Sequence, residues 1–355
     1  MKDLNDRVTP DMLHKDYRLK ENRLEYFTAL YKMNLDHGAM PGMVYLYMPK
    51  LAEHFGWDEE EKLWFAALNG FTQNPITSLR MMQQLPGVPN EAELGRFDTW
   101  FNANWDTLNF DSDRLKNKRN TVAGIRSYAQ LVSEHGGYQT LLWSPEQSYA
   151  EAWGKASSVH SFGRLSTFSY LEYVRIMGYG AQCTDLMFED FDGSRSHRNG
   201  ALFLQGADTL VFDKRADNGF DGNYEHFKPM CEWLLTETNK FLRGFVAQHP
   251  GTRDVGYFTI ESQYCQFKNG FFKRRYPGVY SDMAWDRIKW YDERSSAGDI
   301  TLEGLTEPFK EIRTAFLPEW LREECEVKVT PRAKKASRFA ETGFPYRGEH
   351  FLGVV

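Results

Sequence analysis

The densest group of reactive side chains lies in residues 259–282, TIESQYCQFKNGFFKRRYPGVYSD. On a helix, Glu261, Cys265 and Lys268 are spaced at i, i+4 and i+7 and therefore project from one face. A carboxylate, a thiol and an ammonium on one stripe can form an acid/base or nucleophile site. A helix with an ordinary salt bridge is the alternative interpretation. Asp282, at the end of the stretch, is a further candidate and can instead cap the next helix.

A basic turn follows the same stripe. Lys273, Arg274 and Arg275 stand directly before Tyr276 and a Pro-Gly pair. Three cations beside an aromatic ring and a tight turn suit the binding of a phosphate or pyrophosphate group. A solvated basic loop is the alternative interpretation.

A second group of polar residues lies among aromatic residues in the stretch 157–198. The pattern predicts a helix over 166–177, capped by its first residue, on which Arg164, Glu172 and Arg175 share one broad face. A helix that is apolar on most sides is usually buried, so Glu172 and Arg175 should lie in or beside the interior. They are candidates for a functional pair or for a structural ion pair in a helical core.

An acidic run could hold a divalent metal ion, although a solvated turn is the alternative and no EF-hand is formed. Its members are Asp185, Glu189, Asp190 and Asp192. His160 and His197 flank the central helix and are candidate acid/base groups.

Several familiar catalytic classes are disfavoured by the absence of their motifs. The chain has no GxxxxGK[ST], no GxGxxG after a strand, no GxSxG and no HExxH. Ordinary nucleotide kinases, Rossmann dehydrogenases, α/β hydrolases and zincins are therefore not expected. No motif requires a cofactor, and a divalent metal remains possible.

Composition indicates a folded, aromatic-rich protein of 355 residues, with 41% hydrophobic and 15% aromatic residues. The net charge is −6, but residues 328–355 carry +4. Four widely separated cysteines form no CxxC pair, which favours a reducing cytosol. The N-terminus lacks an apolar core for a signal peptide and no apolar run is long enough to span a bilayer, so a soluble intracellular protein is expected.

The chain is predicted to be mainly α, with minor β structure. Its first 150 residues form a string of helices with short connections, and no regular alternation of strands and helices follows. Residues 201–213 fit either a pair of strands or a buried helix. The expected division is an N-terminal helical region (1–156), a central catalytic region (157–327) and a basic tail (328–355), unless all belong to one domain.

Two blocks together resemble a known family: FGRLSTFSYLEYVRI (162–176) and ESQYCQFKNGFFKRRYPGVYSD (261–282). They resemble the α-glutamyl/putrescinyl thymine pyrophosphorylases, which are bacteriophage amino acid:DNA transferases. The helical domain of phage 5-hydroxymethyluracil DNA kinases is similar, but those proteins also carry a P-loop unit that this chain lacks. The resemblance covers the central part of the chain best.

The resemblance implies a helical fold related to helix-hairpin-helix DNA glycosylases. It implies a substrate of double-stranded phage DNA in which a thymine 5-position is hydroxymethylated and pyrophosphorylated. An amine from an amino acid or a polyamine then replaces the pyrophosphate to give hypermodified thymine. If the chain is phage-encoded, it would act in the host cytoplasm.

The candidate residues can be fitted to that chemistry. Glu172 or Glu261 would take a proton from the incoming amine. Cys265 either adds to the ring at C6 or is a packed thiol. The departing pyrophosphate would be stabilised by cations drawn from Lys273, Arg274, Arg275, Arg164 and Arg175. A base flipped from the duplex would stack on Tyr170, Tyr264 or Tyr276.

Two other functions remain open from the sequence. One is a glycosylase-like enzyme that releases a modified base and leaves an abasic site. The other is a non-catalytic DNA-binding module of a base-modification complex, which would bind DNA with the usual salt dependence.

Overall fold

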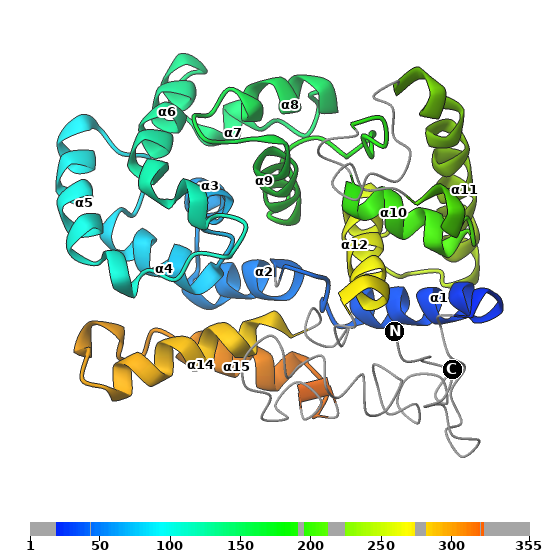
Figure 1. Cartoon of the computed structure of the whole chain (residues 1–355). Coiled ribbons are helices and arrows are strands. Elements are labelled where there is room, and N and C mark those ends of the chain that lie inside the picture. Colours follow the sequence, from blue (N-terminus) through cyan, green and yellow to red (C-terminus); the bar gives the residue numbers. More distant parts are fainter. Residues whose placement is uncertain are drawn as a thin grey trace. The chain divides into compact units, whose positions relative to one another are not determined.

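The structure is a computed structural model that describes residues 19–42, 44–190, 195–211, 224–273, 282–319 and 321–322. Within these residues every regular element is a helix, as Figure 1 shows. The mainly helical fold is therefore confirmed, whereas the minor β structure is not found in this part of the chain. No described helix is both long and apolar enough to cross a membrane.

The described residues form two compact units, and neither is a continuous stretch of chain. With the gaps given above, unit 1 takes its residues from 19–41, 185–283 and 317–322, and unit 2 from 42–184 and 284–316. The domain boundaries placed from the sequence after residues 156 and 327 remain a prediction. The basic tail, 328–355, lies outside the described residues.

Unit 2 is built around one nearly fully buried helix. Its α-helices are α2 (Val44–Phe55), α3 (Glu59–Thr72), α4 (Pro75–Gln84), α5 (Glu91–Ala103), α6 (Thr121–Glu134), α7 (Gln139–Leu142), α8 (Tyr149–Ser157), α9 (Arg164–Ile176), α14 (Met283–Ser296, apart from its first residue) and α15 (Glu307–Phe316). In α3 every residue from Leu63 to Thr72 is buried, and the helix packs on α4 and α9. A capping box between Asp58 and Glu61 fixes where α3 begins.

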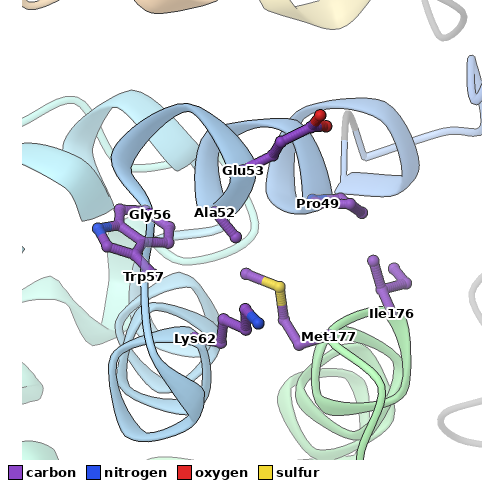
Figure 2. Close-up of a pocket in the computed structure, with 8 residues that line it drawn as sticks. All are labelled: Pro49, Ala52, Glu53, Gly56, Trp57, Lys62, Ile176 and Met177. Carbon is purple, nitrogen blue, oxygen red and sulfur yellow. The ribbon is translucent and has the colours of Figure 1, made fainter.

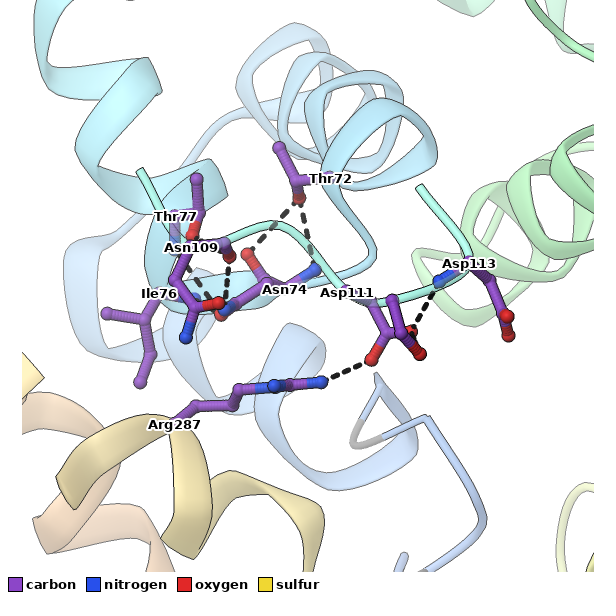
Figure 3. A network of polar contacts seen from close by, with 9 residues as sticks. Thr72, Asn74, Ile76, Thr77, Asn109, Asp111, Asp113 and Arg287 are labelled. Atoms are coloured by element: carbon purple, nitrogen blue, oxygen red, sulfur yellow. Dashed lines mark hydrogen bonds and ion pairs between the residues drawn. The ribbon is translucent and has the colours of Figure 1, made fainter. Parts of the chain in front are cut away.

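The turn between α3 and α4 is the centre of a buried polar network (Figure 3). Asn74 caps α4, accepting from the N–H of Ile76 and Thr77. Its amide donates to the carbonyl of Asn109, 2.6 Å away. Every member of such a network needs a partner when it is buried, so this network holds the helix ends in one arrangement.

Helix α9 begins earlier than the sequence pattern suggests. Gly163 is its extended N-cap residue, so Ser166 lies inside the first turn and the prediction that it caps the helix is wrong. The helix ends where Gly178 adopts φ +98°, a conformation that suits glycine. Arg175, near that end, is exposed, which contradicts its expected place in the interior.

Unit 1 contains α1 (Lys20–Asp36), α10 (Arg195–Leu204), α11 (Lys228–Gln248) and α12 (Tyr257–Lys273). The ambiguous residues 201–213 begin as the buried end of α10 and continue, as far as they are described, in a short 3₁₀ turn (Asp208–Leu210), so the strand interpretation is wrong there. Aromatic rings fill the core: Phe27 of α1 stacks on Tyr264 of α12 at 5.3 Å and meets Phe241 of α11 edge-on. Tyr31 Oη hydrogen-bonds Thr259 Oγ1 at 2.7 Å.

Helices α10 and α12 make the closest helix pair of unit 1. A Cβ atom built on Gly200 would lie 2.1 Å from the carbonyl oxygen of Tyr264, far inside van der Waals contact. Only glycine allows this approach of two backbones. The side chains on either side of the crossing are consequently brought together.

Candidate functional site

A cluster of three reactive side chains lies beside the crossing of α10 and α12 in unit 1. His197 Nδ1 is 3.0 Å from Glu261 Oε1, and both side chains are buried, 1% and 7% exposed. Cys265 is half-buried, and its sulfur, one ring nitrogen of His197 and one carboxylate oxygen of Glu261 all lie within 4.8 Å of one another. The helix stripe expected from the sequence therefore does bring Glu261 and Cys265 together.

The ring of His197 is held in one orientation. Its Nε2 is 2.8 Å from the carbonyl oxygen of Leu186, which can only accept, so Nε2 carries the proton. Nδ1 then faces Glu261 either with a second proton or with a lone pair. One positive species, a proton or a metal ion, must lie between the nitrogen and a carboxylate at 3.0 Å.

Two further residues of the stripe stand beside this cluster. Lys268 is half-buried, and its ammonium donates to Ser196 Oγ at 3.3 Å. Tyr264 is buried in the core and hydrogen-bonds Thr238 at 2.9 Å; burial raises its pKa well above the usual value. Tyr170, in unit 2, is likewise buried, with a raised pKa. Because neither ring exposes a face, base stacking by these two tyrosines is wrong for this structure.

The described members of the acidic run, Asp185, Glu189 and Asp190, do not form a group of converging ligands. Asp185 and Glu189 are exposed, Asp190 is half-exposed, and the Asp185 carboxylate accepts from the N–H of Met187. Among the described residues, the side chains that converge to metal-ligand distances are His197, Glu261 and Cys265. Asp192 lies outside the described residues, and a metal at the acidic run stays a prediction.

Buried side chains hold the backbone of the segment that carries the acidic run. Arg198 is fully buried and donates to the carbonyls of Phe188, at 3.1 Å, and Asp190, at 3.3 Å. Cys231 Sγ also bonds the Phe188 carbonyl, at 3.3 Å. Burial raises the pKa of the Cys231 thiol to about 11, so this cysteine is an inert packed thiol.

A different carboxylate is buried in unit 2. Glu172 of α9 is 5% exposed and accepts a hydrogen bond from the hydroxyl of Tyr45 at 2.9 Å. Arg164, at the start of α9, is half-buried with its guanidinium 5.8 Å from the centre of the Phe168 ring. His160 is exposed.

Unit 2 contains a pocket of about 450 Å³, which Figure 2 shows. It is lined by Pro49, Ala52, Glu53, Gly56, Trp57, Lys62, Ile176 and Met177. Pro49 is four residues after Tyr45 and Ile176 is four residues after Glu172, so the hydrogen bond lies one helical turn from the pocket wall. Figure 2 shows the Lys62 ammonium directed into the space between the helices, whereas the Glu53 carboxylate points away and accepts from Lys50 at 2.6 Å.

Some predicted site residues cannot be placed. Arg274, Arg275 and Tyr276 lie outside the described residues, as does the side chain of Lys273. Asp282 is buried directly before α14.

A model of the amino acid:DNA transferase family matches residues 41–276. The chain belongs to this family. The resemblance of the two sequence blocks is thereby confirmed. A relative from Salmonella phage ViI, named serinyltransferase, is 28% identical over 303 residues, which cover 81% of this chain and 71% of the relative. No solved structure matches the chain.

Both clusters lie within the matched part of this amino acid:DNA transferase. Residues 41–276 include Glu172 with its pocket, and His197 with Glu261 and Cys265. Asp282, α14 and α15 lie beyond the match. The family name gives the two substrates, an amino acid and DNA, and mentions no cofactor.

Sequence reasoning missed two partners that the structure supplies. The pairing of His197 with Glu261 joins residues 64 positions apart, and that of Tyr45 with Glu172 joins residues 127 positions apart. Helical spacing reports neighbours on one helix and carries no signal for partners on another. The sequence gives one indication of such partners: polar residues stand among aromatic residues in the stretch 157–198, and buried polar groups need partners.

Proposed function

We propose that this amino acid:DNA transferase acts on double-stranded DNA that contains pyrophosphorylated 5-hydroxymethyluracil. The nitrogen of an amine forms a bond to the 5-methylene carbon. The bond from that carbon to oxygen breaks, and pyrophosphate leaves with the electron pair. The ammonium group of the donor must first lose a proton, because only a neutral amine is a nucleophile. The route is either direct displacement or an exocyclic methylene intermediate.

Serine is the first donor to test. The support is the name of the phage relative, serinyltransferase. At 28% identity the residues around a donor can differ, so other amino acids and polyamines belong in the same assay. Glycine, glutamate and putrescine are suitable alternative donors, because they differ in net charge.

Besides family membership, the proposal is supported by the position of Glu172 one helical turn from the pocket. Glu172 is a buried carboxylate that accepts a hydrogen bond from Tyr45, and a carboxylate in this position can take a proton from an incoming amine. The pocket one turn away has room for an amino acid, and Lys62 offers an ammonium to its carboxylate. We assign the proton-accepting role to Glu172 in preference to Glu261, which already faces His197.

The remaining roles are proposals carried from the sequence. Cations drawn from the basic turn at 273–275, or from Arg164 or Arg175 on α9, would stabilise the charge of the departing pyrophosphate. Tyr276 would stack on a flipped base. Lys268 and Asp282 are further candidates for proton transfer, and Cys265 for addition to C6.

The test is mass analysis of nucleosides after the purified protein meets DNA bearing the pyrophosphorylated base and a mixture of amines. A new amine-bearing thymidine supports the proposal and identifies the donor at once. Unchanged nucleosides, from protein shown to be folded and to bind this DNA, overturn it in favour of a binding module. Loss of the base, with abasic sites in the DNA, overturns it in favour of a glycosylase.

A further inference from the structure

We infer that His197, Glu261 and Cys265 form a binding site for a zinc ion. The three donor atoms lie within 4.8 Å of one another. Zinc binds nitrogen and oxygen at about 2.0–2.2 Å and sulfur at about 2.3 Å, so its ligand atoms lie about 3–4 Å apart. The 3.0 Å between His197 Nδ1 and Glu261 Oε1 needs only a small adjustment to fit.

The orientation of His197 is the second observation. A histidine that binds a metal through one nitrogen almost always donates its other N–H to a carbonyl or a carboxylate. His197 has this arrangement: Nε2 donates to the carbonyl of Leu186, and Nδ1 faces Glu261. The backbone of the segment before α10 therefore fixes the tautomer that presents a lone pair to the cluster.

The scaffold of the site is rigid. Glu261 and Cys265 are four residues apart on α12, the spacing that places two ligands on one helix face. His197 comes from α10, which Gly200 holds against the backbone of Tyr264. All three ligands are therefore carried by two helices whose distance from each other is fixed by close backbone packing.

Charge and donor chemistry favour zinc over magnesium or calcium. Magnesium and calcium prefer all-oxygen ligand sets, whereas one nitrogen, one oxygen and one thiolate suit zinc. A divalent ion also cancels the two negative charges of the Glu261 carboxylate and a Cys265 thiolate, which a buried site requires.

The three ligands differ in burial: His197 and Glu261 are buried, whereas Cys265 is half-buried. We infer that the fourth coordination position of the ion is open on the side of Cys265. Three protein ligands with a fourth position open are typical of a catalytic zinc site and not of a structural one. The class of ligand that fits the open position is an oxygen donor, such as water or a phosphate oxygen. This inference concerns metal binding and holds whether or not the proposed transfer reaction is correct.

Metal analysis of the untagged, full-length protein tests the site. After expression with added zinc and dialysis against a weak chelator, we expect about one zinc ion per chain. His197→Ala, Glu261→Gln and Cys265→Ser should each retain less than about a tenth of that amount at equal dialysis. Cys231→Ser is the matched control, because this thiol is buried and bonded to a carbonyl, and it should keep its zinc. Circular dichroism shows whether each variant is folded.

Cobalt substitution gives a readout on the wild-type chain that does not depend on any variant. Cobalt(II) added to the metal-free protein should give visible bands of a four-coordinate site and a near-ultraviolet thiolate-to-metal band. Cys265→Ser should lose the thiolate band, and Cys231→Ser should keep it. Absence of the thiolate band in the wild type, or zinc content that is equal in the wild type and the three ligand variants, overturns the inference.

Discussion

Gly200 faces the carbonyl oxygen of Tyr264 so closely that no Cβ atom fits between them. His197 lies one turn before Gly200, and Glu261 lies one turn before Tyr264, so the same crossing that needs glycine sets the His197–Glu261 distance. The close approach of two backbones is thus a condition for the cluster, in addition to its contribution to packing.

Gly200→Ala is expected to destabilise the protein and to move His197 away from Glu261 and Cys265. The new methyl group meets backbone atoms that cannot swing aside, so the helices must separate, at a cost of about 1–3 kcal/mol or more. Thermal unfolding should shift downward, and zinc content should fall. Gly244→Ala on α11 is the control, since its Cβ meets nothing within 4 Å and alanine is the better helix former. Equal midpoints for the two variants would contradict this account of the crossing.

Glu172→Gln is expected to abolish most amine transfer and leave the fold intact. The amide keeps the shape of the side chain and still accepts from Tyr45, but it cannot take a proton. Loss of a general base slows catalysis by about 10²–10⁴-fold. Tyr45→Phe should have a smaller effect, because the carboxylate remains. Single-turnover transfer with saturating donor measures both, and wild-type rates for Glu172→Gln would assign the proton to another group.

Lys62→Met is expected to weaken the use of serine without affecting ethanolamine, which is serine without its carboxylate. Loss of one charge-assisted hydrogen bond should raise KM for serine about tenfold. Lys289→Met is a control on a half-buried lysine that pairs with its own helix neighbour Asp286 and lies over the Trp285 ring. If Lys62→Met changes KM for both donors equally, the pocket does not recognise the carboxylate.

Lys118 should make stability rise with pH in alkaline solution. Burial lowers its pKa from 10.5 to about 8, while its ammonium donates to the carbonyl of Leu108 at 2.7 Å. Between pH 8 and 10.5 the unfolded chain binds a proton at this site that the folded chain has released. The free energy of unfolding therefore gains a contribution that increases across this window and is constant below it. Denaturant unfolding at several pH values should show the rise in the wild type relative to Lys118→Met, and parallel curves would contradict the shifted pKa.

Local features of the fold were readable from the sequence, because they depend on neighbours along the chain. Asp58 and Glu61 signal a capping box, and the structure forms it. The same rules fail where two choices are locally equivalent: Gly163, and not Ser166, precedes the first turn of α9. Arg175 shares a face with Glu172, but its position in the last turn leaves it in solvent. Periodicity identifies which face of a helix is buried. It does not say along how much of the helix neighbouring elements cover that face.

The candidate site was half predictable for the same reason. Glu261 and Cys265 could be placed together because they occupy one helix. The partner His197 depends on how α10 meets α12, and that depends on Gly200, whose role is invisible until the helices are assembled. Discontinuous units have no compositional signal either, because the chain passes between them in short connections and at helix ends of ordinary composition.

The pairing of α1 with α12 has a consequence for how the protein is made. Tyr31 leaves the ribosome 228 positions before Thr259, its hydrogen-bond partner, a delay of about 10–45 s at typical rates of synthesis. During that time Phe27 and Tyr31 have no aromatic neighbours from α11 and α12 to cover them. Unit 1 can therefore close its core only late in translation, and a chain that terminates after residue 184 would leave the aromatic side chains of α1 uncovered and open to chaperones and proteases.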